Sequence, residues 1–224
     1  MGKGRRRQSG FTKNRAARAQ VDFDANAVGA GGFQKRKVDR CLVGSRLGAI
    51  GLLGASNVRK LNPSDLAELL PGLEIVRYGI GGATSIDLLR HADLLIHQES
   101  QMKAMIIHCG TNDLKKRYNR AVSQELNAEA IANDILKLAC RCKDAGIPKI
   151  YISGISPTRI SRSNRLAEDI NRKLEELVKW RDNFYFINNW HIHEGFLYDN
   201  VHLTDHGLKL LYQNYARILG RTLR

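Results

Sequence analysis

Residues 47–57 read LGAIGLLGASN, an apolar run of strand length that ends in a turn of small residues. The run carries no charged residue, which is typical of a strand buried on both faces of a sheet. The residues after the turn have helical periodicity, so we expect Ser56 to lie where a strand becomes a helix. The same succession of strand, small-residue turn and helix recurs along the chain.

Five apolar runs alternate with amphipathic stretches of helical period over residues 47–220. Buried strands that alternate with helices indicate a parallel sheet covered on both faces. The sequence therefore predicts an α/β fold with a five-stranded parallel sheet. The expected strands are 47–54, 73–79, 103–110, 149–156 and 184–189, and the expected helices are about 57–70, 85–98, 125–145, 161–180 and 204–220.

Residues 1–40 lack this periodicity and hold eleven Lys and Arg against three Asp, a net charge of +8 out of a formal +14 for the 224-residue chain. We expect a disordered basic arm at 1–40 and one folded domain at 41–224. Such an arm suits a polyanionic partner, either nucleic acid or an anionic membrane surface, although a solubilising tail would have the same composition. Within it, Lys35-Arg36-Lys37-Val38 resembles a nuclear-import or nucleic-acid-binding patch.

The first residues, MGKGRRRQSG, are not followed by an apolar run, and no stretch approaches the length of a membrane span. The four cysteines are too sparse to indicate a disulfide framework. We therefore expect a protein that is not secreted and that lies in the cytoplasm, with nuclear import through the basic patch. Nothing in the sequence indicates an oligomeric state.

In a doubly wound sheet, ligands bind beyond the carboxyl ends of the strands. Ser56 follows the first predicted strand, Gly82 lies in the small-residue turn after the second, and Asn112 lies in the turn after the third. Asp199 and His202 come just before the last predicted helix. We expect these five residues to meet at one edge of the sheet.

Acyl transfer by a serine needs a base that takes the hydroxyl proton, a carboxylate that orients the base, and donors for the developing oxyanion. With Ser56 as nucleophile, the spacing of Asp199 and His202 lets one turn place the carboxylate on one ring nitrogen while the other nitrogen faces the serine. The expected oxyanion donors are the backbone N–H groups of Ser56 and Gly82 and the side-chain amide of Asn112. We expect no cofactor.

These turns resemble, in order and spacing, the four sequence blocks of the SGNH (GDSL-like) hydrolase superfamily over about residues 45–220. The resemblance implies a flavodoxin-like three-layer α/β/α sandwich and esterase, lipase or carbohydrate-deacetylase activity without a metal. Where the family has Gly-Asp-Ser, this chain has Gly54-Ala55-Ser56, which alters the turn but removes no member of the triad. Ser56 matches the nucleophile block, Gly82 the oxyanion glycine, Asn112 the Gly-x-Asn-Asp block, and Asp199 with His202 the Asp-x-x-His block.

The stretches GASNVRKL, IHCGTNDL and DNVHLTDHG are also similar to esterase-like domains encoded by animal LINE-type retrotransposons. This second resemblance implies that residues 1–40 contact RNA or an anionic membrane.

Two other motifs point to chemistry that the rest of the chain does not support. Gly79-x-Gly81 begins like a dinucleotide-binding fingerprint, but Thr84 stands at the position of the third glycine. His191 and His193 have a spacing that metals use, yet no cluster of cysteines or carboxylates accompanies them. We expect these two histidines to line a cleft or face solvent.

Two further groups of residues lie at strand ends. His108 ends the third predicted strand and is expected to be a hydrogen-bonded core residue. Arg159, Arg162 and Arg165 follow the fourth strand, and they form either a solvated face or a site for an anionic substrate.

The leading functional hypothesis is a serine esterase or acyl hydrolase that cleaves an ester or O-acetyl group of a small-molecule, lipid or carbohydrate substrate. The alternative is a retroelement-associated nucleic-acid-binding protein whose arm at 1–40 binds RNA or DNA while the hydrolase domain serves as a scaffold. A third hypothesis is a lipid esterase that its positive charge draws to an anionic membrane.

Overall fold

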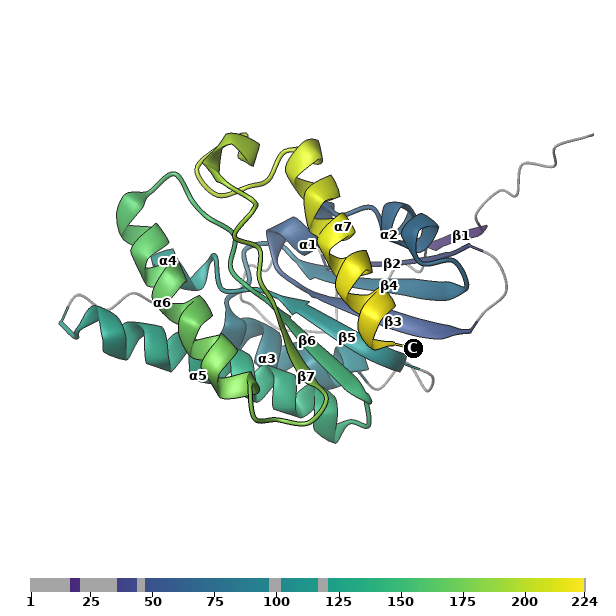
Figure 1. Ribbon diagram of the computed structural model, residues 1–224, viewed down its shortest axis with the longest axis horizontal. Helices are drawn as coiled ribbons and strands as arrows, with labels where there is room; N and C mark the ends of the chain where they lie inside the picture. The colour runs from purple at the N-terminus through teal and green to yellow at the C-terminus, as the bar shows by residue number, and fades with distance from the viewer. Residues whose placement is uncertain (1–16, 21–35, 44–46, 97–101, 117–120, 224) are drawn as a thin grey trace, which may run out of the picture.

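The computed structural model describes residues 17–20, 36–43, 47–96, 102–116 and 121–223. Strands and helices alternate through most of this range (Figure 1). The elements in chain order are β1 (Ala17–Gln20), β2 (Arg36–Leu42), β3 (Gly48–Gly54), α1 (Ser56–Lys60), α2 (Pro63–Leu69), β4 (Leu73–Ile80), α3 (Ser85–Ile96), β5 (Met102–His108), α4 (Asp113–Lys116), α5 (Gln124–Asp144), β6 (Lys149–Ser153), α6 (Ser161–Val178), β7 (Phe184–Ile187), the 3-10 helix η1 (Glu194–Phe196) and α7 (Asp205–Thr222).

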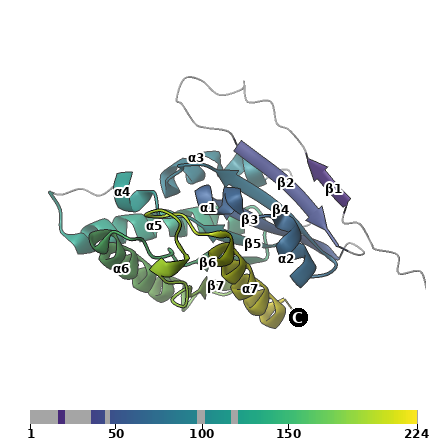
Figure 2. The same ribbon diagram turned by 90° about the horizontal axis from the view of Figure 1, so that it is seen from above.

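In the described part of the chain, the sheet has seven strands in the order β1-β2-β4-β3-β5-β6-β7. The strands from β4 to β7 pair in parallel, and their order is that of flavodoxin-like sheets. Residues of α3, α5 and α6 pack on one face of the sheet, and residues of α1, α2 and α7 pack on the other (Figures 1 and 2). The predicted three-layer α/β/α fold with five parallel strands is therefore confirmed, with two antiparallel strands added at one edge.

Those two strands correct the prediction of an arm without structure. β2 pairs antiparallel with β4, and β1 pairs antiparallel with β2 (Figure 2). Asp39 of β2 forms an ion pair with Arg77 of β4, which is only 2% exposed and also donates to the carbonyl of Leu61. The sequence did not predict β2 because the strand has no alternating apolar face. Backbone hydrogen bonds and a charge pair hold it in the sheet instead. Residues 1–16 and 21–35 of the predicted arm lie outside the described residues.

The helix expected at 57–70 is wrong in one respect, because the structure divides it into α1 and α2. Pro63 has no N–H to donate and begins α2, and the side chain of Asn62 caps that helix by accepting from the Ser64 N–H. The break confines α1 to the five residues that follow β3. The short elements α4 and η1 were not predicted.

The carboxyl ends of β3, β4 and β5 lie side by side, since Gly54 pairs in register with Gly79 on one side and with His108 on the other. The helices after β3 and β5 pack on opposite faces, and a crevice at such a switch point is the usual ligand site of this fold. A Cβ at Gly54 would lie 2.2 Å from the carbonyl oxygen of His108, so only glycine fits where β3 passes β5. The loops that carry Ser56, Gly82 and Asn112 all begin at this edge.

Within the described residues, no helix is long and apolar enough to cross a bilayer. The four cysteines, Cys41, Cys109, Cys140 and Cys142, are all free thiols.

Candidate active site

Ser56 is the first residue of α1 and follows β3 after the single linking residue Ala55. Ala55 has no side chain that can cap the helix, and its backbone is held by a hydrogen bond from its N–H to the carbonyl of His108. The Ser56 side chain is half-buried. This turn places the hydroxyl at the carboxyl edge of the sheet, beside a helix start whose first N–H groups favour negative charge.

Asp199 and His202 are brought together by a tight turn between η1 and α7. The Nδ1 atom of His202 lies 2.6 Å from Oδ2 of Asp199, and Oδ1 of Asp199 accepts from the N–H groups of Val201 at 2.8 Å and His202 at 2.7 Å. Burial would raise the pKa of Asp199, but these hydrogen bonds and the His202 ring lower it to about 2. The carboxylate is therefore ionised at neutral pH and fixes the ring by its Nδ1 atom.

The turn that carries His202 contacts α1 at two places, one just before Asp199 and one just after His202. Buried Asn57 accepts from the Leu203 N–H through its Oδ1 atom at 3.4 Å. Lys60 bonds to the Tyr198 hydroxyl and lies 4.2 Å from the centre of that ring, and the Tyr198 ring in turn stacks on His202 at 5.7 Å. Sequence reasoning missed both contacts, since each joins residues more than 130 positions apart.

Ser56 and His202 both lie in the described part of the chain, and their side chains do not form a hydrogen bond with each other. Hydrogen bonds of this kind are often long without a ligand and shorten in the substrate complex. The contacts between α1 and the turn that carries His202 bring Ser56 and His202 into the same region, but the two side chains are not hydrogen-bonded to each other.

Gly82 and Asn112 lie in neighbouring loops that bond to each other. Asn112 donates through its side-chain amide to the Ala83 carbonyl at 2.9 Å, and Lys116 donates to the Gly82 carbonyl at 2.6 Å. Gly82 has a φ of +73°, a conformation that favours glycine whatever space is available. Two of the three predicted oxyanion residues, Gly82 and Asn112, therefore lie in loops that contact each other, and Lys116 is an unpredicted support for the Gly82 loop.

Asp113 is a second support that sequence reasoning missed. Its carboxylate is fully buried and accepts from the Ser85 N–H, at 2.9 and 3.1 Å, and from the Ser85 hydroxyl at 2.6 Å. These bonds tie the loop after β5 to the start of α3. Asp113 stands in the same Gly-Thr-Asn-Asp motif as Asn112, but the motif does not reveal which residue it binds.

His108, at the end of β5, is buried beneath these loops as predicted. Its Nδ1 atom lies 2.9 Å from the Ser153 hydroxyl, which also bonds to Asn189 at 2.8 Å and to Tyr215 at 3.0 Å. Burial lowers the pKa of His108 to about 4, so the ring is neutral at neutral pH. This network joins β5, β6, the segment after β7 and α7.

The three arginines after β6 are placed differently from one another. Arg159 donates to the Leu197 carbonyl at 2.6 Å, and its own N–H donates to the Asn200 carbonyl at 2.9 Å. It therefore lies against the turn that carries Asp199. Arg162 and Arg165 are exposed on the first turns of α6.

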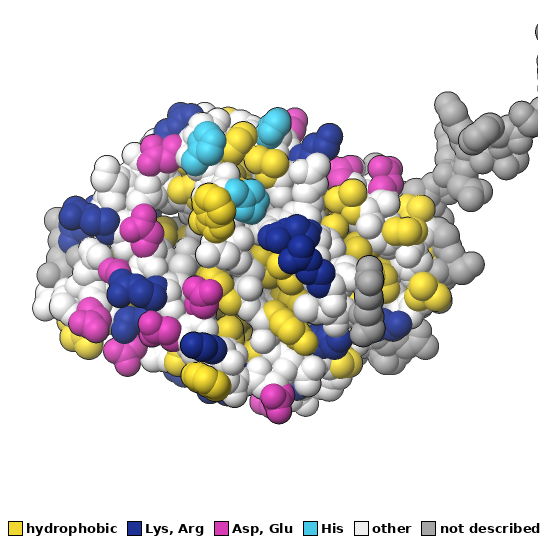
Figure 3. Space-filling view, viewed as in Figure 1, with side chains coloured by type: hydrophobic (Ala, Val, Ile, Leu, Met, Phe, Trp, Pro, Cys, Tyr) yellow, Lys and Arg dark blue, Asp and Glu magenta, His cyan; other side chains and the backbone are white. Residues whose placement is uncertain are grey.

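Four of the seven histidines lie between residues 191 and 206, and histidine side chains gather near the upper edge of the face in Figure 3. Among the described residues, however, no group of three or more His, Cys, Asp or Glu is arranged to hold a metal ion. His193 instead caps η1, because its Nδ1 atom accepts from the Gly195 N–H at 3.2 Å. His191 is half-buried.

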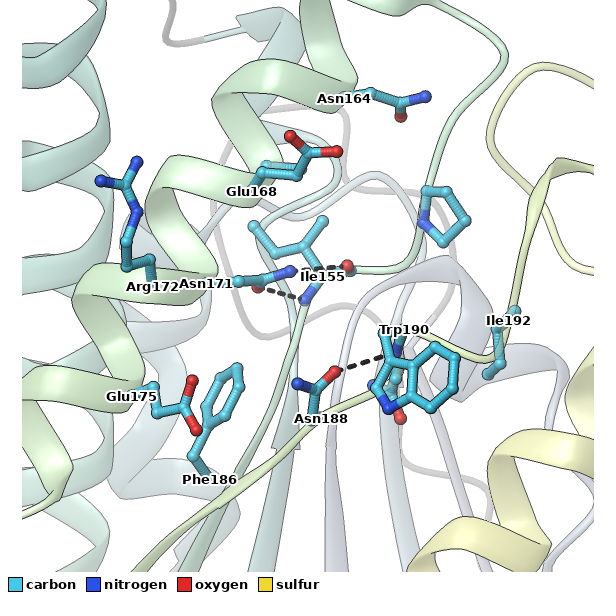
Figure 4. A pocket seen from close by; sticks show the side chains of 13 residues that line it. Ile155, Asn164, Glu168, Asn171, Arg172, Glu175, Phe186, Asn188, Trp190 and Ile192 are labelled. Atoms are coloured by element: carbon cyan, nitrogen blue, oxygen red, sulfur yellow. Dashed lines mark hydrogen bonds between the residues drawn. The ribbon is translucent and has the colours of Figure 1, made fainter.

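A cavity of about 370 Å³ lies between α6 and the segment after β7 (Figure 4). Trp190, which is 82% exposed, faces α6 across this cavity. Asn171 shapes the wall by bonding to both the N–H and the carbonyl of Ile155. None of the five predicted site residues lines the cavity. Its lining residues are Ile155, Pro157, Asn164, Ala167, Glu168, Asn171, Arg172, Glu175, Phe186, Asn188, Asn189, Trp190 and Ile192.

The parallel order of the strands and the loops grouped at the switch point define an α/β/α protein whose ligand site lies at the carboxyl edge of the sheet. The chain belongs to the GDSL-like lipase/acylhydrolase family, whose model matches residues 50–210. That range includes all five predicted site residues. No curated protein has a significantly similar sequence.

Solved structures of ester-hydrolysing enzymes share the fold at low sequence identity. Est24, a carbohydrate acetylesterase from Sinorhizobium meliloti, is 15% identical, with a TM-score of 0.65 over 78% of this chain and 99% of that chain. Axe2, an acetylxylan esterase from Geobacillus stearothermophilus, is 16% identical, with a TM-score of 0.64 over 79% of this chain and 95% of that chain. A lipolytic G-D-S-L family protein from Veillonella parvula is 12% identical, with a TM-score of 0.65 over 77% and 98%.

Proposed function

We propose that the chain is a serine esterase in which Ser56, His202 and Asp199 form the catalytic triad. The observation that carries the proposal is the 2.6 Å contact between Asp199 and Nδ1 of His202, which leaves Nε2 as the only ring nitrogen that can act on the serine. His202 takes the proton of Ser56 as Oγ bonds to the ester carbonyl carbon. It then gives that proton to the departing alcohol, and water releases the acyl group by the reverse sequence.

The tetrahedral oxyanion is bound by the backbone N–H groups of Ser56 and Gly82 and by the second side-chain N–H of Asn112. Asn112 uses one N–H on the Ala83 carbonyl, which orients its amide plane, and the other remains for the substrate. The support of the Gly82 loop by Lys116 keeps these donors in place before substrate binds, which is the source of their catalytic value.

The proposed acyl group is small, an acetyl or similar short chain. This choice rests on the acetylesterase activities named for two proteins of the same fold, on sugar and xylan substrates. The alcohol part is a carbohydrate, a lipid or another small molecule.

The test is hydrolysis of p-nitrophenyl acetate together with labelling by a fluorophosphonate probe. Wild type should turn over the ester and take up the probe, while Ser56→Ala should do neither. Ser161→Ala, which changes an exposed serine on α6, is the matched control and should behave as wild type. Equal rates for wild type and Ser56→Ala would reject the proposed nucleophile.

A second candidate function, nucleic-acid binding by residues 1–40, is favoured by the net charge of +8 in that segment. The similarity to esterase-like domains of animal LINE-type retrotransposons is part of the same proposal. Removing residues 1–16 deletes six Lys and Arg but retains β1 and β2.

Fluorescence anisotropy with a single-stranded RNA tests this second function. Wild type should bind with an affinity that falls steeply with salt, and the truncated chain should bind more weakly with a shallower salt dependence. Flotation with phosphatidylserine vesicles distinguishes an anionic membrane from RNA as the partner. Equal RNA affinity of the two chains would exclude the arm as the binding segment.

A further inference from the structure

Four cationic side chains extend from the segments that surround Ser56. Two come from α1, directly after Ser56, one comes from α4, after Asn112, and one comes from the segment that touches the Asp199 turn. None of the four forms an ion pair with a carboxylate of the described chain, so their charges are not neutralised by direct contact. They are Arg59, Lys60, Lys116 and Arg159.

Three of the four are instead held by neutral oxygens of the site's own loops. Lys60 bonds to the Tyr198 hydroxyl, Lys116 to the carbonyl of Gly82, and Arg159 to the carbonyl of Leu197. A carbonyl or phenol positions a cation without cancelling its charge. These bonds therefore fix three positive charges around the serine while their field remains available to a ligand.

Arg59 is the fourth cation and the least constrained. Its guanidinium lies against Gly81, where an added Cβ would come within 2.8 Å of an Arg59 nitrogen. Among the described residues, the Arg59 side chain makes no hydrogen bond or ion pair, and the Arg59 backbone N–H donates to the Ala55 carbonyl at 2.9 Å. The N–H donors of this guanidinium, which lies beside Gly81, are therefore without a partner in the described chain, which suits a planar anion such as a carboxylate.

The carboxylates near the site are already engaged or remote from the serine. Asp199 is bonded to His202, and Asp87 accepts two bonds from Thr84. Asp205, on the first turn of α7, acts on Lys60 only through space. Burial of the Lys60 ammonium lowers its pKa, as does the nearby charge of Arg59, while Asp199 and Asp205 oppose that shift. Asp199 and Asp205 thus offset part of the charge of Lys60, while Arg59 and Arg159 have no ion pair with a carboxylate among the described residues.

From this arrangement we infer that the preferred substrate is an ester whose alcohol part carries a carboxylate or a phosphate, bound by Arg59, Lys60 and Arg159. The inference rests on the proposed esterase function. The anion lies on the alcohol part because the proposed acyl group is too short to carry one. The three cations are specificity-determining residues, and Lys116 acts as a positioning residue for the Gly82 loop.

The experiment compares three acetate esters: 4-acetoxybenzoate, its neutral methyl ester, and 4-acetoxyphenyl phosphate. The measured quantity is the ratio of kcat/KM for each anionic ester to kcat/KM for the methyl ester. Because the intrinsic reactivities of the esters differ, the ratio in each variant is divided by the ratio in wild type, which cancels that difference. The two anionic esters distinguish a carboxylate from a phosphate as the recognised group.

Arg59→Gln and Arg159→Gln should each lower the ratio about threefold to tenfold, and the double variant should lower it further. The wild-type ratio should also fall as ionic strength rises from about 0.01 to 0.5 M, because salt screens exposed charges. Lys137→Gln, which removes an exposed cation on α5 far from the serine, is the matched control and should leave the ratio unchanged.

Ratios that are the same in wild type and in both arginine variants, and that do not change with salt, would overturn the inference. Hydrolysis of the acetate group of the neutral methyl 4-acetoxybenzoate would then still support the esterase proposal. If no ester is hydrolysed by any form of the protein, the proposed function itself fails.

Discussion

The side-chain oxygen of Asn57 accepts a hydrogen bond at 3.4 Å from the backbone N–H of Leu203, a residue 146 positions away. Each is the sequence neighbour of a residue in the proposed triad, Ser56 in one case and His202 in the other. Since Asn57 is 4% exposed, water does not replace this contact easily if it is lost. The bond therefore ties α1, which begins with Ser56, to the turn that carries His202.

Replacing Asn57 by alanine should reduce catalysis more than stability. We expect kcat/KM for p-nitrophenyl acetate to fall about tenfold to a hundredfold, because small displacements of reacting groups have large effects on rate. Stability should fall by about 1–3 kcal/mol, the usual loss for a buried polar group left unsatisfied.

Asn127→Ala supplies the matched control for Asn57. Asn127 is also 4% exposed, and it bonds to the Ser123 carbonyl at 3.0 Å on α5, away from the site. Urea unfolding should show similar losses of stability for the two variants, but only Asn57→Ala should lose activity beyond its unfolded fraction. If both lose activity in parallel, Asn57 is merely structural.

Asp199→Asn tests the charge on the carboxylate separately from its shape. With a pKa of about 2, Asp199 is ionised throughout the pH range in which the protein would be assayed. The amide cannot stabilise the imidazolium and turns the ring toward the wrong tautomer, so kcat should fall roughly 10³- to 10⁴-fold. Stopped-flow measurement of the acylation burst reports this loss directly. A decrease of less than tenfold would remove Asp199 from the triad.

Asn112→Ala tests the oxyanion role of the side-chain amide. Loss of one such donor lowers kcat by about 10² to 10³ with little change in KM, because the bond strengthens as negative charge develops. Asn112→Asp keeps the shape but presents negative charge to the oxyanion, and should be at least as impaired. Steady-state kinetics of both variants test this. A retained kcat with only a higher KM would contradict the role of Asn112 as an oxyanion donor.

The sequence predicted the parallel sheet because its strands are short, mainly apolar runs, of which β3 is buried along its whole length. β3 and β5 have no competing local signal, and their loops carry the recognisable residues. β2 could not be predicted in this way, because Asp39 and its partner Arg77 are joined only when β2 lies beside β4. A charged strand such as β2, which lies between β1 and β4, has no periodic pattern of apolar residues that would reveal it.

The same distinction applies to the site. Ser56, Asp199 and His202 follow from short motifs, whose spacing fixes their local geometry. Asn57 and Lys116 were missed since each acts through a backbone atom of a distant loop, and any residue type would offer that atom. Sequence motifs reveal reactive groups, while tertiary contacts determine which residues hold them in place.

His108 should make the stability of the protein depend on pH. Burial lowers its pKa from 6.5 to about 4 in the folded chain, so between these values the unfolded chain binds a proton that the folded chain does not. Stability is therefore complete above about pH 6.5 and falls as the pH decreases toward 4, by at most about 3 kcal/mol. Urea unfolding at several pH values measures this loss.

His108→Gln keeps a partner for Ser153 but cannot titrate, so its stability should change less over this range than that of wild type. His206→Gln, at an exposed position on α7, should retain the wild-type slope, whereas equal slopes for wild type and His108→Gln would show that the buried ring does not control the transition.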